Sequence, residues 1–325
     1  MTIDFCGIGN AGIDIIANVH DQFLVQWNFP KSICTYLNLQ QADALEAALP
    51  NPQYIPGGCS ANVADCISAL GGTAAFIGRM ADDSIGRRFL DDLKKNNIRY
   101  TGIPDTQKGA GSTRIFTLVT PDAERTFASY YGVQEDLSVA DLDRDSIKEA
   151  KFLCMDGYAL NARVSVDAFA EAATIARAAG RTVVLSPNDL SILDKYKEAV
   201  DSLIPLSDMI LVNAQEAMFM TRTFDLSAAI EKIRTIFKSG AVTAGQDGVY
   251  VFDQKHIHHV PVATPPAPVT DTNGAGDAFA AGLLFGLCRD YDLRSAAALG
   301  NRCAAVIITH PGARPRAGFK EFVTA

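Results

Sequence analysis

Small residues cluster before a long apolar run near the end of the sequence, where residues 271–279 read DTNGAGDAF. We expect Gly274, Ala275 and Gly276 to form the start of a buried helix, because AGDAFAAGLLFGLC is apolar on nearly all faces. The free backbone N–H groups of such a helix start can bind an anion. An alternative is that the small residues only allow close packing, with Asp277 as a first-turn acid favoured by the helix dipole.

A second glycine-rich stretch, PGGCSANVADC, covers residues 56–66. Gly57 and Gly58 allow a close approach to the backbone, and residues 60–62 are expected to begin a helix. The alternative is an ordinary glycine turn followed by a serine cap.

The N-terminal run CGIGNAG satisfies the spacing G-x-G-x-x-G of a dinucleotide site. That motif also needs a following helix and an acid about 20 residues later. Here the following residues resemble a strand, and no Asp or Glu lies between Asp21 and Asp43. We therefore do not favour NAD binding, which leaves Asn10 and Asp14 as polar residues in an apolar setting. Their simplest roles are a turn residue and a solvated carboxylate.

Other chemistries have weaker support in the sequence. There is no G-x-x-x-x-G-K-[ST] phosphate loop. The histidines of HIHH, at 256, 258 and 259, alternate as in an exposed hairpin and have no further ligand cluster, so a metal site is not favoured. The seven cysteines are scattered without a CxxC pair, as expected of buried thiols in a reducing compartment.

The composition limits the partners. The chain has 325 residues, a net charge of −8 and an isoelectric point near 5.1, which argues against nucleic acid as a partner. The N-terminus lacks the pattern of a signal peptide, and the longest apolar run is too short for a membrane span. We expect a cytoplasmic protein with no membrane contact.

Strand-like and helix-like segments alternate from about residue 60, which predicts a parallel sheet with helices on both faces. Ligands of such sheets bind at the carboxyl ends of the strands. Two β-rich stretches, 13–38 and 98–130, interrupt this order, and the second has a hairpin turn at TPDAE. They are either two halves of one lid sheet or unrelated edge hairpins. Trp27 lies in the first stretch, where it either packs the lid or covers a substrate. We predict a discontinuous core of residues 1–12, 39–97 and 131–325, with a β lid of residues 13–38 and 98–130.

Several motifs together resemble those of one enzyme family. DTNGAGDAFAAG is similar to the C-terminal signature of the ribokinase/PfkB family of carbohydrate and nucleoside kinases, and GGCSAN, ALGG and FIGRMADDSIG resemble its N-terminal signature. NAQE, at 213–216, matches the N-x-x-E motif of this family, and VTAGQDG matches its T-x-G-x-x-G nucleotide segment. The similarity covers essentially the whole chain with the motifs in order. It implies a ribokinase-like three-layer α/β/α domain with a mostly parallel central sheet and a small β-sheet lid.

Within the family the chain resembles the adenosine kinase branch. Asn273 stands where many sugar kinases have threonine, and TPDAERTF followed by YYG resembles a lid strand bearing an arginine. The sequence departs from the branch at Asp189 and Leu190, near the expected position of an aromatic residue that stacks on the base. The acceptor is therefore predicted as an adenosine-like nucleoside or, alternatively, a fructose- or ribose-type sugar.

The resemblance implies transfer of the γ-phosphoryl group of Mg-ATP to a primary hydroxyl. It makes Asp277 the base and the backbone at 274–276 an anion hole, with Arg125 reaching the phosphoryl group from the lid. The implied acceptor residues are Asn10, Asp14, Gly58 and Asn62. The implied nucleotide residues are Asn213, Thr243, Gly245, Gly248 and Asn301. Glu216 is implied to organise Mg²⁺ through water, and Asp271 to fix the loop and offer a site for a monovalent cation such as K⁺.

Simpler roles are open for some of these residues. Arg125 could be a surface charge, and Asn213 and Glu216 could be a helix cap and a first-turn acid. A non-catalytic binding protein of the same fold is a further alternative. The presence of Asp277 argues against it, because a binding protein has no need of a base. The exposed edge of a β lid also makes a homodimer an option.

Overall fold

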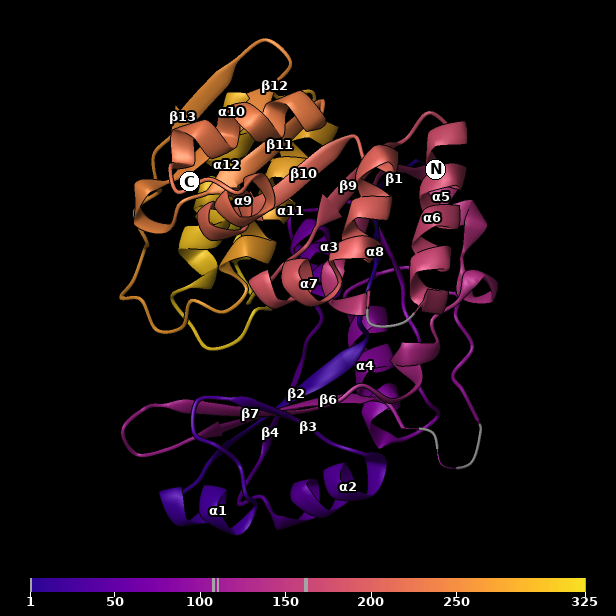
Figure 1. Ribbon diagram of the computed structural model, residues 1–325, viewed down its shortest axis with the longest axis vertical. Coiled ribbons are helices and arrows are strands. Elements are labelled where there is room, and N and C mark those ends of the chain that lie inside the picture. The colour runs from indigo at the N-terminus through magenta and orange to yellow at the C-terminus, as the bar shows by residue number, and fades with distance from the viewer. Residues whose placement is uncertain (1, 107–108, 110, 161–162, 325) are drawn as a thin grey trace.

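The computed structural model describes residues 2–106, 109, 111–160 and 163–324. The predicted core and lid also contain residues that lie outside the described ranges, namely 1, 107–108, 110, 161–162 and 325. Over the described ranges the strands form two sheets, one of eight strands and one of five. Figure 1 shows the smaller sheet below the main α/β domain.

The larger sheet is mostly parallel, as predicted from the alternation of strands and helices. Its order is β13-β12-β11-β10-β9-β8-β1-β5, and only the pairings of β11 with β12 and of β12 with β13 are antiparallel in the part described. The carboxyl ends of the parallel strands therefore meet at one edge. The strands are β1 (Ile3–Ile8), β5 (Ala74–Ile77), β8 (Ala150–Asp156), β9 (Thr182–Ser186), β10 (Met209–Asn213), β11 (Ser239–Thr243), β12 (Val249–Asp253) and β13 (Ile257–Val260).

Helices cover both faces of this sheet, because successive buried side chains of each strand point to opposite faces. Phe5 of β1 belongs to one hydrophobic cluster, and Cys6 and Ile8 belong to the other. The first cluster includes side chains of α3 (Cys59–Ala69), α4 (Ser84–Lys95), α11 (Ala275–Cys288), α12 (Leu293–Ile307) and α13 (Phe319–Thr324). The second includes α5 (Arg144–Glu149), α6 (Arg163–Ala178), α7 (Leu190–Lys195), α8 (Lys197–Leu203), α9 (Ala214–Thr221) and α10 (Leu226–Ile236). Short 3₁₀ segments lie at Gly132–Asp136, Val139–Asp141, Gly157–Ala159, Ile204–Leu206 and Gly245–Asp247.

The smaller sheet joins the two predicted β-rich stretches. Its order is β3-β7-β6-β2-β4, with β2 (Gly12–Asn18), β3 (Cys34–Tyr36), β4 (Gln53–Pro56), β6 (Thr113–Val119) and β7 (Arg125–Tyr130). The predicted hairpin turn between β6 and β7 is present, and Thr120 N–H donates to the Glu124 carbonyl at 3.0 Å. The pairing of two distant stretches into one sheet is thus confirmed.

The structure differs from the predicted boundaries in two places. Residues 53–56, assigned to the core, form β4 and pair antiparallel with β2, with Ile55 opposite Asp14. Residues 21–26, expected in a β-rich stretch, form the helix α1 (Asp21–Gln26), because Phe23, Leu24 and Trp27 have helical rather than strand spacing.

The outer face of the smaller sheet is covered by α1 and α2 (Leu39–Ala48), which lie on the side away from the main domain (Figure 1). Trp27 is half-buried there, with its ring centroid 6.0 Å from each of the rings of Phe23 and Phe29. The tryptophan therefore packs the lid rather than covering a substrate.

The N-terminal glycine motif does not lead into a helix. Gly12 instead begins β2, which belongs to the smaller sheet. The helix that a dinucleotide site needs is therefore replaced by a strand. In the described part of the chain, no helix has both the length and the apolar character needed to cross a membrane.

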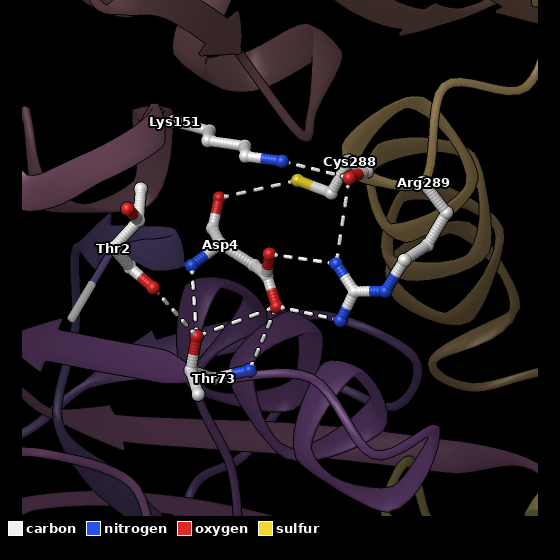
Figure 2. Close-up of polar contacts among 6 residues, drawn as sticks. All are labelled: Thr2, Asp4, Thr73, Lys151, Cys288 and Arg289. Carbon is white, nitrogen blue, oxygen red and sulfur yellow. Dashed lines mark hydrogen bonds and ion pairs between the residues drawn. The ribbon is translucent and has the colours of Figure 1, made fainter.

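A polar network fixes the far end of α11, the helix that begins at the predicted anion site (Figure 2). The Arg289 guanidinium bonds both carboxylate oxygens of Asp4 at 2.8 and 3.0 Å, and Lys151 Nζ donates to the Cys288 carbonyl at 2.7 Å. Thr73 N–H also donates to Asp4 at 2.9 Å. Two cations thus lie at the negative end of the helix dipole, which they stabilise.

Candidate active site

The predicted anion loop forms the start of α11. Gly274 is the N-cap residue with φ 76°, and an ideal Cβ there would lie 2.3 Å from Ala313 Cβ. Only glycine fits this position. An ideal Cβ on Gly276 would meet no described heavy atom within 4 Å, so its backbone faces open space. The loop therefore presents N–H groups of the first helical turn, as the sequence predicts.

Asp277 lies in the first turn of α11 and accepts a hydrogen bond of 2.8 Å from Asn62 Nδ2. Burial raises the pKa of Asp277 to about 7, and the nearby carboxylate of Asp156 also raises it. The Asn62 amide, the Cys59 thiol and the charge of Arg314 act in the opposite direction. A carboxylate with this pKa can accept a proton near neutral pH and is matched to general-base chemistry.

Asp14 and the Gly57–Gly58 turn form the other side of the site. An ideal Cβ on Gly57 would lie 2.9 Å from Asp14 Oδ2, and one on Gly58 would lie 2.2 Å from the Asn10 carbonyl oxygen. Gly58 has φ 84° and caps α3, the helix that carries Asn62. Burial raises the pKa of Asp14 to about 6, against the lowering effect of Arg314.

Two buried amide oxygens in this region have no hydrogen-bond partner among the described residues, namely Oδ1 of Asn10 and Oδ1 of Asn62. The Asn10 amide nitrogen donates to the Tyr158 carbonyl at 3.1 Å, which orients the side chain. An unpaired buried acceptor is costly unless a ligand supplies the donor. A hydroxyl-bearing ligand would do so.

A cavity of about 260 Å³ extends from Asp277 along the carboxyl ends of β8, β10 and β11. It lies where ligands bind in parallel α/β sheets. The predicted residues that line it are Asn213, Glu216, Thr243, Gly274, Ala275, Gly276 and Asp277.

Asn213 and Glu216 form a reciprocal cap at the start of α9, as the simpler interpretation expects. The Asn213 side chain accepts from Glu216 N–H and the Glu216 carboxylate accepts from Asn213 N–H, both at 2.9 Å. Burial raises the pKa of Glu216, with a smaller contribution from Asp189. Because both residues also line the cavity, the cap places a buried carboxylate at its wall.

The other predicted nucleotide residues lie outside the cavity lining. Gly245 has φ 58°, and an ideal Cβ there would meet no described heavy atom within 4 Å. Gly248, with φ 87°, packs against the Val260 carbonyl, which an ideal Cβ would approach to 2.3 Å. Asn301 is buried and donates to the carbonyls of Val260 and Pro261 at 3.3 and 2.6 Å. Its side chain holds the end of β13.

Arg125 reaches from the smaller sheet to the anion loop, where it pairs with Asp271 at 3.4 Å. Asp271 also accepts from the N–H groups of Asn273 at 3.0 Å and Gly312 at 3.2 Å. Burial acts to raise the pKa of Asp271, but these hydrogen bonds and the charge of Arg125 outweigh it and lower the pKa. The carboxylate thus fixes the loop, as the sequence implies.

Sequence reasoning missed Asp156, a buried carboxylate at the end of β8. It accepts from Tyr158 N–H at 3.0 Å, from Asn188 Nδ2 at 2.6 Å and from Ser60 N–H at 3.4 Å. Burial raises the pKa of Asp156 to about 6. Its position directly after the buried strand KFLCM was the available signal, because ligands lie at such strand ends. Arg314 was also missed, since it follows no recognisable motif.

The fold and the site together define a group-transfer enzyme of the ribokinase-like α/β class, with a buried carboxylate beside a helix start suited to an anion. Residues 32–317 match the model of the pfkB family of carbohydrate kinases. The chain belongs to this family, whose kinases are phosphotransferases with alcohol acceptors.

Proteins similar to this chain include both sugar and nucleoside kinases. "Probable fructokinase-6, chloroplastic" from Arabidopsis thaliana is 31% identical over 306 residues, which cover 88% of this chain and 76% of that protein. The structure of an adenosine kinase from Sinorhizobium meliloti has a TM-score of 0.89 and 30% identity, covering 99% of this chain and 98% of that one. A "probable sugar kinase protein" from Rhizobium etli CFN 42 has the same TM-score at 29% identity, covering 100% and 98%.

Proposed function

We propose that the protein transfers the γ-phosphoryl group of Mg-ATP to a primary hydroxyl, with Asp277 as the general base. One observation carries this proposal: a carboxylate whose pKa is raised to about 7 lies in the first turn of a helix that opens on the cavity. A base is best matched to its task when its pKa is near the working pH. The neighbouring N–H groups can stabilise the charge that develops on the phosphoryl group.

The acceptor would lie between the smaller sheet and α3. The Asp14 carboxylate accepts hydrogen bonds from hydroxyls, and the unpaired oxygens of Asn10 and Asn62 offer two further acceptors. Gly58 allows the backbone to approach closely. The attacking hydroxyl would then donate its proton to Asp277, which already accepts from Asn62. Arg125 would move from Asp271 to the transferring group.

The nucleotide would occupy the cavity and the adjoining surface at Gly245, and the proposed residues Gly248 and Asn301, both buried beside the Val260 carbonyl, would support this surface from within. Among the described residues no group of three or more His, Cys, Asp or Glu is arranged to hold a metal ion. The cavity wall instead offers the buried carboxylate of Glu216, which fits Mg²⁺, because this ion takes few protein ligands and keeps several waters. Glu216 would hold the ion through water, and the bound ion would neutralise phosphate charge. Asp271 is proposed to border a site for K⁺.

We propose an adenosine-like nucleoside as the acceptor, because apolar side chains lie near Asp14 on its face of the smaller sheet, which also carries the polar residues Gln53, Thr117 and Ser129. The strand registers place Ile16, Ile115, Ile55 and Phe127 on this face, and all four are half-buried. A flat base could cover these side chains, whereas a hexose would leave them against hydroxyl groups. A sugar acceptor remains the second candidate, supported by the unpaired amide oxygens and by the fructokinases among the relatives.

The proposal is tested by ADP release with Mg-ATP over adenosine, inosine, guanosine, ribose, fructose and sugar phosphates. We expect the highest kcat/KM with adenosine, and a reduction in kcat of about 10²–10⁴-fold in Asp277→Asn with little change in acceptor binding. Release that is faster with fructose would select the sugar alternative. No release with any acceptor would instead favour a non-catalytic binding protein.

We also propose that two copies associate through the smaller sheet. β3 lies at one end of this sheet, and the side chains of Ile33 and Tyr36 are 56% and 62% exposed. An open strand edge of this kind is suited to pairing with a second copy. Sedimentation velocity should show a dimer, and a monomer at all concentrations would contradict it.

A further inference from the structure

Arg314, in the segment after α12, is bonded to the turn that carries Gly57. Its Nε donates to the Pro56 carbonyl at 3.3 Å, its Nη2 to the Gly57 carbonyl at 3.2 Å and its Nη1 to the Ala61 carbonyl at 2.7 Å. The side chain is only 10% exposed. The planar guanidinium therefore joins the end of β4 to the first turn of α3.

Two carboxylates complete the surroundings of this buried cation. Asp65 of α3 and Asp92 of α4 each lie 3.6 Å from a terminal nitrogen of Arg314. A buried charge is tolerated only when it is paired and hydrogen-bonded. Because three carbonyls and two acids surround the guanidinium, its position is closely restrained.

The turn that Arg314 holds contacts the acceptor side of the site directly. Gly57 packs on the Asp14 carboxylate, and the Gly58 carbonyl accepts from Asn62 N–H at 2.8 Å. The Asn62 side chain in turn donates to Asp277. A displacement of this turn would therefore move Asp14 and Asn62 relative to the base.

The two residues before Arg314 support the anion loop. Gly312 N–H donates to Asp271 at 3.2 Å, and Ala313 lies under Gly274, where an ideal Cβ would approach it to 2.3 Å. Residues 312–314, which we call the bridging segment, thus contact both the acceptor turn and the anion loop.

We propose that Arg314 is a positioning residue for phosphoryl transfer, which holds the acceptor turn in register with the anion loop through the bridging segment. The kinetic part of this inference rests on the proposed kinase function. Arg314 is not one of the residues that line the cavity. Its effect on the reaction passes through the Gly57–Gly58 turn, Asn62 and the electric field at the two site carboxylates.

The charge of Arg314 gives the proposal a second readout. It lowers the pKa of Asp14 and of Asp277, both of which burial raises. Other groups also act on these pKa values. Asn62, Cys59 and Asp156 act on the pKa of Asp277. Arg314 itself lies beside Asp65 and Asp92, and Lys95 acts on the pKa of Asp65. Removing the cation should therefore move the acidic limb of the pH profile of kcat/KM to higher pH.

The test compares Arg314→Lys, which keeps the positive charge but loses the planar guanidinium, with Arg314→Met, which loses both the charge and the guanidinium. Arg316→Met is the matched control, because Arg316 lies two residues away and is exposed. We expect Arg314→Lys to raise the KM for the acceptor about 10-fold, with the KM for ATP changed less than about twofold and the pH profile unmoved. Arg314→Met should show the same KM change, together with the shift of the acidic limb. Calorimetry should show weaker acceptor binding in both variants.

Failure of the inference is distinguishable from failure of the proposed function. An active wild-type enzyme with unchanged acceptor KM and binding in Arg314→Lys overturns the positioning role, even if Arg314→Met does not fold. Equal losses for ATP and acceptor would indicate only a general structural role and also overturn it. If the wild-type protein phosphorylates none of the acceptors, the proposed function fails, and calorimetric acceptor binding alone decides the role of Arg314.

Discussion

At the scale of single residues, three carboxylates share a buried region and do not have the same surroundings. Burial raises the pKa of Asp14 and Asp156 to about 6 and that of Asp277 to about 7. Asp156 is bonded by two backbone N–H groups and by Asn188, whereas Asp277 accepts from Asn62. The carboxylate of Asp277, at the start of α11, is thus the least stabilised anion of the three, and it is the one proposed to take up the proton of the acceptor.

The pH dependence of the reaction follows from these surroundings. The base must be ionised, so we expect kcat/KM to rise with pH up to about 7 and then level off. Asp156→Asn removes a negative charge that raises the pKa of Asp277, so the rise should move to lower pH. Steady-state rates between pH 5 and 9 provide the measurement (roughly the range in which such a group titrates). A rise that stays in place, or moves to higher pH, would mean that Asp156 does not act on the base.

The residues that the sequence revealed are those with a local signature. Gly274, Gly276 and Asp277 could be predicted because small residues next to an apolar helix have a direct physical meaning. Asp156 and Arg314 could not be assigned in this way, since their roles depend on contacts with residues 96 and more than 250 positions away. The smaller sheet shows the same limit. Four of its strands lie in or at the edge of the two stretches predicted to be β-rich, but β4 was assigned to the core, because its pairing with β2 depends on tertiary packing.

At the scale of elements, the start of α11 offers a matched pair of variants. Gly274→Ala forces a side chain into a backbone with φ 76° and against Ala313, so we expect a loss of at least about 2 kcal/mol in the free energy of unfolding, together with loss of activity. In Gly276→Ala the new methyl group meets no described atom, and alanine is a better helix former than glycine. The free energy of unfolding should therefore be unchanged or up to about 1 kcal/mol higher.

The activity of Gly276→Ala should nevertheless fall, because the new methyl group projects toward the space of the phosphoryl group. We expect a loss in kcat/KM of about 10²-fold, the size seen when one anion-binding donor is removed. Urea unfolding and ADP release on the same preparations give both quantities. Full activity in Gly276→Ala would show that the anion does not approach this backbone.

The opposite end of α11 tests how the helix is held. Asp4 is 8% exposed as a side chain and pairs with both terminal nitrogens of Arg289, as Figure 2 shows. We expect Asp4→Asn to lower the free energy of unfolding by about 2 kcal/mol at pH 7, the size of a charge-assisted hydrogen-bond pair. Arg294→Gln, at an exposed position of α12, is the control and should have no effect.

The effect of Asp4→Asn on the free energy of unfolding should also depend on pH. Burial acts to raise the pKa of Asp4, but the bonds from Arg289 and Thr73 outweigh it and lower the pKa below the value of the unfolded chain. The stabilisation is therefore present above that unfolded value and is lost as the pH falls toward the folded one. The difference between wild type and Asp4→Asn should shrink below about pH 4. A difference that is constant with pH would rule out the ion pair as its source.

At the scale of the whole molecule, the acceptor site is shared between two bodies of secondary structure. Asp14 belongs to the smaller sheet, whereas Asn62 and Asp277 belong to the main domain. Besides the bonds of Arg314 to β4 and α3, two contacts among the described residues join the bodies at the rim of the site: Arg125 pairs with Asp271, and the Lys195 ammonium lies 5.1 Å from the centre of the Tyr36 ring. An acceptor bound to both bodies would add a further link.

This arrangement predicts which ligand holds the smaller sheet against the main domain. An acceptor bound as proposed would bridge Asp14 and the main domain, so adenosine alone should slow amide hydrogen exchange in β2, β6 and β7, since those strands would be held in place. A non-hydrolysable ATP analogue bound as proposed would lie along the ends of β10 and β11 in the main domain, so alone it should protect β10, β11 and the start of α11 and leave the smaller sheet unchanged. Asp14→Ala should abolish the effect of adenosine on the smaller sheet while the effect of the analogue persists. Protection of the smaller sheet by the analogue alone would contradict this division, because it would mean that the nucleotide, and not the acceptor, joins the two bodies.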